Sequence, residues 1–262
     1  MHHSFLSYCT LIEKYFGQYN GLIGKQIEKL IELFDFTGKG TEMGYRTQAS
    51  AVYSSNIEGN SIDLNSFMNY KLSPGKFKPQ KEIQEIENLV LAYQFAQANP
   101  LTETNFLHCH KIFAKTLVIK SKQGKYRTEK VGVFGQSGLV YLAIEPELVK
   151  EAMTEFFTDL DDLLKRNLSI AEVFYFASLV HLKFVHIHPF RDGNGRAARL
   201  IEKWFLSEKL GNDFWKLSSE KYYKEHQSEY YSNINLCVNY YTLNYDKCIP
   251  FLLMLPKSME DK

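Results

Sequence analysis

The segment SIAEVFYFASLVHLKFVHI, residues 169–187, is followed directly by HPFRDGNGRAAR, residues 188–199. Ser169 and Glu172 have the spacing of a capping box, in which each side chain bonds the other residue's backbone N–H at a helix start. After that start, apolar residues occur on every side of the helix, which is typical of a helix buried in a bundle. We therefore expect residues 169–187 to form the central helix of an α-helical domain.

Helical periodicity also dominates the rest of the chain. It predicts helices at residues 22–33, 45–58, 81–98, 103–117, 147–166, 197–210, 219–237 and 246–255. Residues 131–144 differ, because β-branched residues broken by Gly135 and Gly138 are typical of a β-hairpin. The sequence thus predicts an all-α fold, a helical bundle with one small β-hairpin. A loop rich in proline and glycine at residues 72–80 separates an N-terminal helical arm, residues 1–75, from the main domain, residues 76–262.

The composition limits the kinds of partner. A formal net charge of +1, from 31 basic and 30 acidic residues, argues against a dedicated nucleic-acid-binding protein. The longest apolar run near the C-terminus, residues 248–255, is too short to cross a membrane, and the N-terminus does not resemble a signal peptide. We expect no nucleic acid and no membrane among the partners. The cysteines are far apart and form no CxxC pair, so we expect reduced thiols in a cytoplasmic protein; they are Cys9, Cys109, Cys237 and Cys248.

The stretch at residues 188–199 suits an anionic ligand. Gly193, Asn194 and Gly195 lie where the next helix begins, and backbone N–H groups at a helix N-terminus bind anions. Arg196 and Arg199 fall in the first turns of that helix, where cations oppose the helix dipole. A bound anion would offset this penalty, and the guanidinium group matches phosphate oxygens well. The pattern therefore predicts a phosphate-binding site.

Two further groups flank this predicted phosphate site. Asp192 supplies a carboxylate, and Mg²⁺ is commonly held by one or two carboxylates together with substrate phosphates. His188 can accept a proton from an attacking hydroxyl. One alternative is a plain turn between helices with solvated arginines. Another is a metal site formed by His181, His186 and His188, but we expect His181 and His186 to be hydrogen-bonded core residues instead.

Residues 188–199 resemble the signature of the Fic family, HPFx[DE]GNGRxxR, and match it at every fixed position. KYRTEKVGVFGQSGLVYL, residues 125–142, is similar to the segment that leads into the family's flap hairpin. SEYYSNINLC, residues 228–237, is similar to its double-tyrosine helix near the nucleotide base. SSNIEG, residues 54–59, resembles the inhibitory motif [ST]xxxE[GN]. The resemblance implies a Fic-type helical bundle whose N-terminal arm carries the inhibitory motif.

The family typically transfers AMP from ATP to a hydroxyl side chain of a target protein. The resemblance therefore implies a Mg²⁺-dependent protein adenylyltransferase that uses ATP and releases pyrophosphate. His188 would be the general base toward a Tyr, Thr or Ser hydroxyl, and Asp192 would hold Mg²⁺. The implied nucleotide-binding residues are Gly193, Asn194, Gly195, Arg196, Arg199, Tyr230 and Tyr231, with Arg199 at the γ-phosphate. The flap is implied at Val133, Phe134, Gly135 and Gln136.

The inhibitory motif, Ser54, Glu58 and Gly59, also has a physical interpretation. Glu58 ends a predicted helix with Gly59 near its C-cap, and a carboxylate there opposes the helix dipole, which suggests a partner elsewhere. We predict that Glu58 pairs with Arg199, misplaces the γ-phosphate and holds the enzyme inactive until the arm moves. Two alternatives remain, a glutamate that positions water for removal of AMP and a plain surface residue.

The C-terminal stretch departs from the family pattern. The family often shows an asparagine followed closely by an aspartate, whereas six residues separate Asn239 from Asp246. The base contacts are therefore not defined, and a Fic-like transferase with another nucleotide donor is a second hypothesis. A third is a non-catalytic nucleotide-sensing module, although the intact His188 argues against it. Self-modification and a weak homodimer complete the expected interactions.

Overall fold

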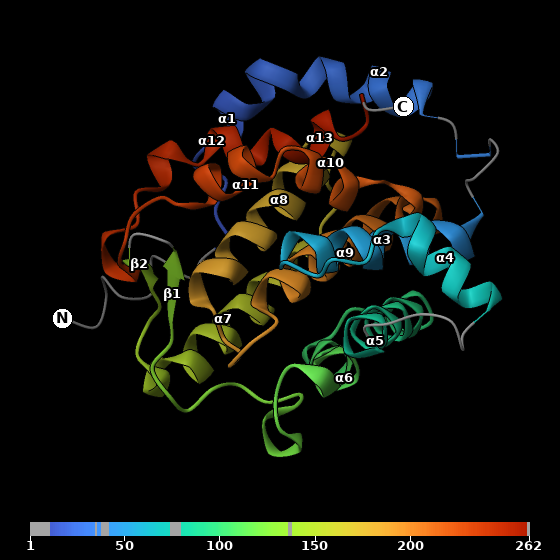
Figure 1. Cartoon of the computed structure of the whole chain (residues 1–262). Coiled ribbons are helices and arrows are strands. Elements are labelled where there is room, and N and C mark those ends of the chain that lie inside the picture. The colour runs from blue at the N-terminus through green and yellow to red at the C-terminus, as the bar shows by residue number, and fades with distance from the viewer. Residues whose placement is uncertain (1–10, 35, 38–41, 74–79, 136–137, 261–262) are drawn as a thin grey trace.

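The computed structural model describes residues 11–34, 36–37, 42–73, 80–135 and 138–260 of the chain. The centre of the protein is α8 (Ile170–Ile187), which packs against α7 (Pro146–Lys165) and α9 (Asn194–Leu210) (Figure 1). The remaining helices surround these three, and a two-stranded hairpin lies beside them. The predicted all-α bundle with one small hairpin is confirmed.

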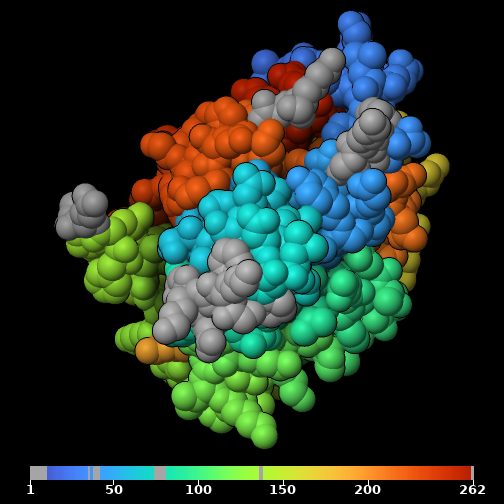
Figure 2. All heavy atoms as spheres, turned by 45° about the vertical axis from the view of Figure 1, so that its right-hand side comes forward, coloured from blue at the N-terminus to red at the C-terminus, as the bar shows by residue number. Residues whose placement is uncertain are grey.

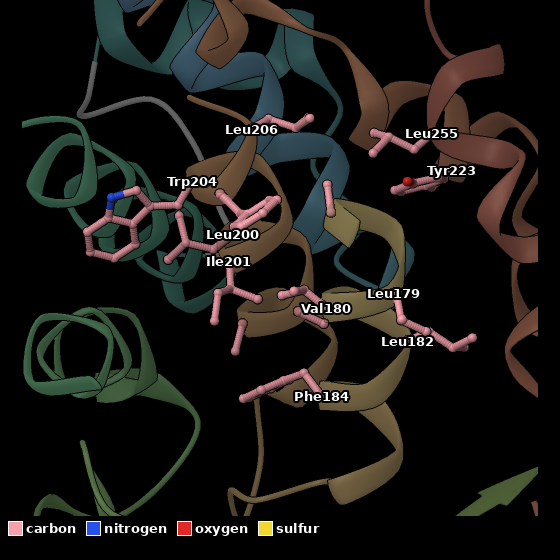
Figure 3. Packing of buried hydrophobic residues seen from close by; sticks show 14 of the residues in the cluster. Leu179, Val180, Leu182, Phe184, Leu200, Ile201, Trp204, Leu206, Tyr223 and Leu255 are labelled. Carbon is pink, nitrogen blue, oxygen red and sulfur yellow. The ribbon is translucent and has the colours of Figure 1, made fainter. Parts of the chain in front are cut away.

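The position of α8 follows from its sequence. The predicted capping box is present, with Ser169 Oγ accepting from the Glu172 N–H at 3.3 Å and the Glu172 carboxylate accepting from the Ser169 N–H at 2.7 Å. In the described part of the chain, α8 alone is long and apolar enough to cross a membrane, yet 89% of it is buried inside the protein. Side chains of α8 such as Val180 meet those of α9 such as Ile201 in the core (Figure 3). It is therefore the core helix of the bundle.

The other elements are arranged around this core in chain order. The N-terminal ones are α1 (Phe16–Tyr19), a π-helical turn η3 (Asn20–Gly24), α2 (Lys25–Leu33), α3 (Met43–Ile57) and α4 (Leu64–Leu72). The middle ones are α5 (Gln80–Gln97), α6 (Glu103–Phe113), the 3₁₀ turns η5 (Ala114–Thr116) and η6 (Lys120–Lys122), β1 (Gly132–Gly135) and β2 (Gly138–Leu142). After α9 come η7 (Asn212–Lys216), α10 (Ser219–Glu225), α11 (Gln227–Ile234), η8 (Tyr240–Thr242), η9 (Tyr245–Lys247), α12 (Ile249–Leu252) and α13 (Met254–Lys257).

The predicted inhibitory motif, residues 54–59, begins on the last turn of α3 and continues past its end, and α3 lies between other helices. It packs against α5, α9 and α10. In the space-filling view, α3 and α4 (blue to cyan) lie between the C-terminal helices (orange) and α5 and α6 (green) (Figure 2). The N-terminal residues therefore lie against both halves of the predicted main domain. The predicted boundary between residues 75 and 76 stays a prediction.

The two outer edges of the hairpin differ in the described part of the chain. β1 and β2 pair antiparallel, with an irregularity in register after Val133. On the far side of β2, Leu142 donates its N–H to the Val238 carbonyl at 2.8 Å and forms a parallel bridge with Asn239. The outer edge of β1 has no such strand partner within the described residues. The turn predicted at GQSG includes residues 136–137, which lie outside the described residues.

Most predicted helices are present, but three need correction. The predicted helix 197–210 begins three residues earlier, at Asn194, so Gly195 and Arg196 belong to its first turn. The predicted helices 219–237 and 246–255 are instead shorter helices and 3₁₀ turns. The first is interrupted at His226 and ends at Ile234. For the second, part of the reason is local, because the Asn244 side chain caps a 3₁₀ turn at its start and Pro250 fits only the first turn of a helix. The loop at 74–79 and Cys9 lie outside the described residues, and the other three cysteines are free.

Candidate active site

His188 follows the last residue of α8 and has a backbone conformation that side chains rarely adopt. Its φ of 53° and ψ of 56° are left-handed, and it is the one non-glycine residue with a positive φ in the described part of the chain. This conformation costs roughly 1–2 kcal/mol for an ordinary residue. The His188 N–H still closes the helix by donating to the Phe184 carbonyl at 3.0 Å. The strained backbone turns the chain out of α8 at the histidine.

Arg127 holds this strained segment in place. Its Nε donates to the His188 carbonyl at 2.8 Å, and its Nη2 donates to the Ile144 carbonyl at 2.7 Å. Its backbone N–H donates to the Pro189 carbonyl at 2.8 Å. Because the side chain is almost fully buried, these bonds are shielded from water. Arg127 lies in the segment that resembles the lead into the flap, but its role could not be predicted, since an arginine in a polar stretch does not reveal carbonyl partners far along the chain.

Asn194 closes the loop between α8 and α9. Its Oδ1 accepts from the Phe190 N–H at 2.8 Å, and its Nδ2 donates to the Phe190 carbonyl at 2.9 Å. We predicted that Asn194 cradles phosphates with Gly193 and Gly195. In the structure both polar atoms of its side chain bond the Phe190 backbone, so only the backbone N–H of Asn194 remains available to bind a ligand.

The N-terminus of α9 is open for an anion. Gly193 is the N-cap with a φ of 84°, and no side chain caps the helix. The Gly193 N–H donates to Asp192 Oδ1 at 2.6 Å, and the first intrahelical bond comes from the Ala197 N–H. The N–H groups of residues 194–196 have no bond to another described residue. Such groups, with the helix dipole behind them, bind phosphate or carboxylate oxygens.

A cleft of about 580 Å³ joins this helix end to His188 and the hairpin. The predicted site residues that line it are Glu58, Val133, Phe134, Gly135, His188, Asp192, Gly193, Asn194, Gly195, Tyr230 and Tyr231. Four others do not line it, namely Ser54, Gly59, Arg196 and Arg199. Gln136 lies outside the described residues. The fold thus brings together predicted site residues from four separate stretches of the sequence.

His188 is neutral and has one nitrogen available as a base. Its Nδ1 lies 3.1 Å from the Val185 carbonyl, which can only accept, so Nδ1 carries the proton. Burial lowers the pKa of His188 to about 4, although the bond to Val185 opposes this effect. Nε2 is then the unprotonated nitrogen at neutral pH. The predicted general base is therefore in a suitable protonation state.

Asp192 fits a magnesium ion that is shared with a phosphate ligand. Its carboxylate is exposed in the cleft, and one oxygen accepts from the Gly193 N–H, which leaves the other available. No group of three His, Cys, Asp or Glu side chains that could enclose a metal occurs among the described residues. Mg²⁺ often uses one carboxylate plus waters and substrate phosphates, so a single protein ligand beside an anion site suits it.

Glu58 lies against Arg199, as the sequence predicted. Arg199 Nη2 donates to Glu58 Oε1 at 2.7 Å; the Arg199 side chain is fully buried and that of Glu58 is 26% exposed. Burial alone would raise the pKa of Glu58, but the charges of Arg199 and Arg196 and the bond from Arg199 lower it below its usual value. Glu58 follows α3 as its C-cap, and Gly59 has a φ of 94°. The carboxylate is therefore ionised and held by the arginine.

The Glu58 carboxylate also covers the open end of α9. A Cβ placed on Gly195 would lie 2.2 Å from Glu58 Oε1, so only glycine admits the carboxylate there. Arg199 is also bonded by Ser54, with Nε donating to Oγ and Nη2 donating to the backbone carbonyl, both at 2.9 Å. The end of α3 thus supplies an anion to the site that the sequence analysis predicted for phosphate.

Comparison with known proteins identifies the domain. Residues 100–206 match the model of the Fic/DOC family. The chain carries a Fic/DOC family domain. A curated relative, protein adenylyltransferase Fic of Nematostella vectensis, is 40% identical over 78 residues, which are 30% of this chain and 16% of the relative. Protein adenylyltransferase fic-1 of Caenorhabditis briggsae is 28% identical over 158 residues, 55% of this chain and 29% of the relative. The matches thus span less than a third of each curated relative.

Solved structures show the same Fic fold over nearly the whole chain. A Fic family protein from Desulfovibrio desulfuricans G20 has a TM-score of 0.72 at 22% identity and covers 95% of this chain and 73% of its own. Fic-1 from C. elegans has a TM-score of 0.68 at 20% identity and covers 93% of this chain and 70% of its own. The fold likeness extends beyond the matched Fic/DOC segment and includes the region of α3.

The two predicted nucleotide-binding tyrosines lie C-terminal to the matched Fic/DOC segment, and Tyr231 contacts the end of α3. Tyr231 donates from its hydroxyl to the Ile57 carbonyl at 2.9 Å. The Tyr230 hydroxyl lies 3.1 Å from Arg199 Nη1, and the residue is almost fully buried. Arg196 bonds Glu85 and is also buried. The nucleotide roles of these three residues stay predictions, but each has a defined hydrogen-bond partner in the structure.

Proposed function

We propose that this protein is a Mg²⁺-dependent protein adenylyltransferase that transfers AMP from ATP to a Tyr, Thr or Ser hydroxyl of a target protein. One observation carries the proposal: the unprotonated Nε2 of His188 and the uncapped N-terminus of α9 share one cleft. A base and an anion site in the same cleft suit transfer of a phosphate-bearing group to a hydroxyl. The curated relatives named protein adenylyltransferase support ATP as the donor.

The proposed reaction takes place with Glu58 moved away from the N-terminus of α9 and uses the other side chains of the cleft as they lie. The ATP phosphates bind the N–H groups of residues 194–196, and Mg²⁺ held at Asp192 would neutralise phosphate charge. His188 Nε2 accepts the proton of the target hydroxyl as its oxygen bonds to the α-phosphorus. The bond from that phosphorus to the bridging oxygen breaks, and pyrophosphate leaves. The neutral Nδ1–H form of His188, fixed by Val185, is the form that this step needs.

The hairpin suits an extended target segment. The outer edge of β1 has no strand partner among the described elements, whereas β2 is bridged to Asn239. A peptide can add to such an edge through main-chain hydrogen bonds, which place its side chains without requiring much sequence. A second cleft of about 1010 Å³, lined by Ile119, Lys130 and Arg191, continues from the hairpin beyond Asp192. We propose that the target runs along β1 with its hydroxyl at His188.

We further propose that Glu58 inhibits the enzyme. Its carboxylate bonds Arg199 and lies on Gly195, where phosphate oxygens would bind. Arg199 is the arginine expected at the γ-phosphate, so ATP and Glu58 would compete for it. Tyr231 and Gln227 both bond the Ile57 carbonyl, at 2.9 and 2.7 Å, and hold this end of α3 down. Release of α3 would be needed for productive ATP binding.

The deciding experiment compares wild type, Glu58→Gly and His188→Ala with α-labelled ATP, Mg²⁺ and cell lysate. We expect label on protein with Glu58→Gly, little with wild type and none with His188→Ala added to Glu58→Gly. Thermal melting of each variant controls for unfolding. Label transferred only from γ-labelled ATP would show a kinase-like reaction and reject the proposal. Nucleotide binding with no transfer to any protein would favour the sensing module instead.

A further inference from the structure

Behind the nucleotide site, a chain of buried polar side chains leads away from Arg199. The Arg199 Nη1 lies 3.1 Å from the Tyr230 hydroxyl, and that hydroxyl lies 2.9 Å from His181 Nε2. His181 Nδ1 in turn lies 2.8 Å from Glu202 Oε2. All four side chains are buried from solvent, and none of them beyond Arg199 is used by the proposed reaction. Burying polar groups costs folding free energy unless each has a hydrogen-bond partner, so a series of four buried polar side chains suggests a function.

The hydrogen bonds in this chain all run in one direction. Arg199 can only donate, so the Tyr230 oxygen accepts. The Glu202 carboxylate can only accept, so His181 Nδ1 carries its proton. The Tyr230 hydroxyl, whose oxygen accepts from Arg199, can donate its own proton to His181 Nε2, so each group in the series has a partner. A cation at one end and a carboxylate at the other align the dipoles between them, which strengthens each bond.

The end of this hydrogen-bonded series that is far from Arg199 is held by residues of three helices. His181 lies on α8, Glu202 on α9 and Tyr223 on α10. The Tyr223 hydroxyl donates to the Glu202 carboxylate, at 3.0 Å from Oε1. His181 also packs edge-on against the Phe251 ring, with the centroids 5.0 Å apart. The imidazole of His181 is therefore held in position independently of the inhibitory segment.

The bonds to Arg199 fall into two groups that come from different parts of the protein. Its Nε and Nη2 bond Ser54 and Glu58 at the end of α3. Its Nη1 bonds Tyr230 on α11. If the end of α3 moves away, every α3 bond is lost, and the bond to Tyr230 is the one that remains. The guanidinium group would otherwise be free to change rotamer when a phosphate must meet it.

We propose that His181 and Glu202 are positioning residues that act through Tyr230 to keep the Arg199 guanidinium directed at the anion site. The inference rests on the proposed function, in which the anion is Glu58 in the inhibited state and the terminal phosphate of ATP in the active state. A positioned arginine serves both states, so loss of the chain has opposite effects in two backgrounds. It weakens inhibition in wild type and weakens ATP binding where Glu58 is absent.

The test uses Tyr230→Phe, which keeps the ring and removes the hydroxyl, and His181→Leu. Tyr245→Phe is the matched control, because the Tyr245 hydroxyl also bonds a buried histidine of α8, His186, at 2.7 Å but does not reach Arg199. Each substitution is made in wild type and in Glu58→Gly. ATP and ADP binding are measured by titration calorimetry, and transfer is measured with α-labelled ATP.

In Glu58→Gly, we expect Tyr230→Phe and His181→Leu to weaken ATP binding about tenfold or more, as loss of a charged hydrogen bond does, and to change ADP binding by less than about twofold. In wild type, the same substitutions should raise transfer severalfold. His181→Gln, whose amide oxygen can accept from Tyr230, should restore part of the ATP affinity. Tyr245→Phe should leave both nucleotides and both backgrounds near their starting values.

Three results would overturn the inference: equal losses for ATP and ADP, a fall in transfer in both backgrounds, or the same effect from Tyr245→Phe. Each would indicate a structural role alone. Because Tyr230→Phe removes one oxygen from a packed ring, it keeps the test valid if His181→Leu does not fold. Failure of the proposed function itself is distinct, since Glu58→Gly without further change would then bind no ATP or transfer nothing.

Discussion

Replacing Glu58 by glycine removes the contact on which the proposed inhibition depends. The substitution removes the bond from Arg199 Nη2 to Glu58 Oε1, 2.7 Å long, and uncovers the N-terminus of α9 beside Gly195. A hydrogen bond to a charged group contributes about 1.5–3 kcal/mol, and each 1.4 kcal/mol is a factor of ten. We therefore expect nucleotide transfer to rise by about 10- to 150-fold at limiting ATP.

The same change has a stability cost that can be measured separately. Removing one partner of a fully buried ion pair costs about 3–5 kcal/mol. Glu58 is 26% exposed, and Arg199 keeps its bonds to Ser54 and Tyr230, so we expect a smaller loss. A loss of about 1–3 kcal/mol would lower Tm by about 2–10 °C. Added ATP should recover more Tm in the variant than in wild type, because phosphate replaces the missing carboxylate.

The assay is incorporation of α-labelled ATP at matched protein concentration, alongside thermal melting with and without ATP. Glu58→Gln is the companion variant, since it keeps the size of the side chain and removes its charge. The reasoning is refuted if Glu58→Gly melts as expected and binds ATP but transfers no faster than wild type. It is also refuted if ATP raises Tm equally in the two proteins, because Glu58 and ATP would then not compete.

Other predictions concern pH and the support of the loop. Since burial lowers the pKa of His188 to about 4, transfer by Glu58→Gly should be flat from about pH 5.5 to 8, and a decline in kcat/KM centred near the ordinary histidine value would contradict a neutral base. Burial also lowers the pKa of His186 from 6.5 to about 3. The unfolded chain then binds more protons between these two pKa values, so stability falls as the pH is lowered through that window, by about 2 kcal/mol at pH 5 for this group, and urea unfolding at pH 7.5 and 5 tests the sign. Arg127→Met removes the side-chain donor to three carbonyls, those of His188, Glu129 and Ile144, and should lower the free energy of unfolding by about 2–4 kcal/mol. Added to Glu58→Gly, it should also slow transfer. A lower Tm with unchanged transfer would show that Arg127 supports the fold but not His188.

The sequence predicted those features that depend on local pattern or on a specific motif. The capping box at Ser169, the buried character of α8 and the hairpin all depend on neighbouring residues, and the structure has each of them. The Glu58 and Arg199 contact spans 141 residues along the chain, and only the two motifs together could suggest it. Periodicity failed after α9, where His226 interrupts one predicted helix and the Asn244 cap and Pro250 shorten the other.

The predictions also missed roles that depend on tertiary contacts. His181 was correctly expected to be a hydrogen-bonded core residue, but its partners Tyr230 and Glu202 lie on other helices. Arg127 and Asn194 use their side chains on backbone groups, and a backbone partner leaves no signal in the sequence. Such contacts depend on how the helices pack against one another, and a pattern in the sequence of one segment does not specify that packing.

The free edge of β1 has a consequence for the biology of such an enzyme. An edge that binds main chain discriminates poorly among amino-acid sequences, because every peptide offers the same N–H and C=O groups. Because β2 is bridged to Asn239 through Leu142, the edge of β1 is the side of the hairpin that is available to bind a target peptide in the described part of the chain. Under the proposed function, selectivity would then depend more on when the enzyme is active than on which peptide sequences it binds. The few hydrogen bonds at the end of α3 would decide when the enzyme modifies its surroundings, and β1 would set few limits on which proteins it modifies.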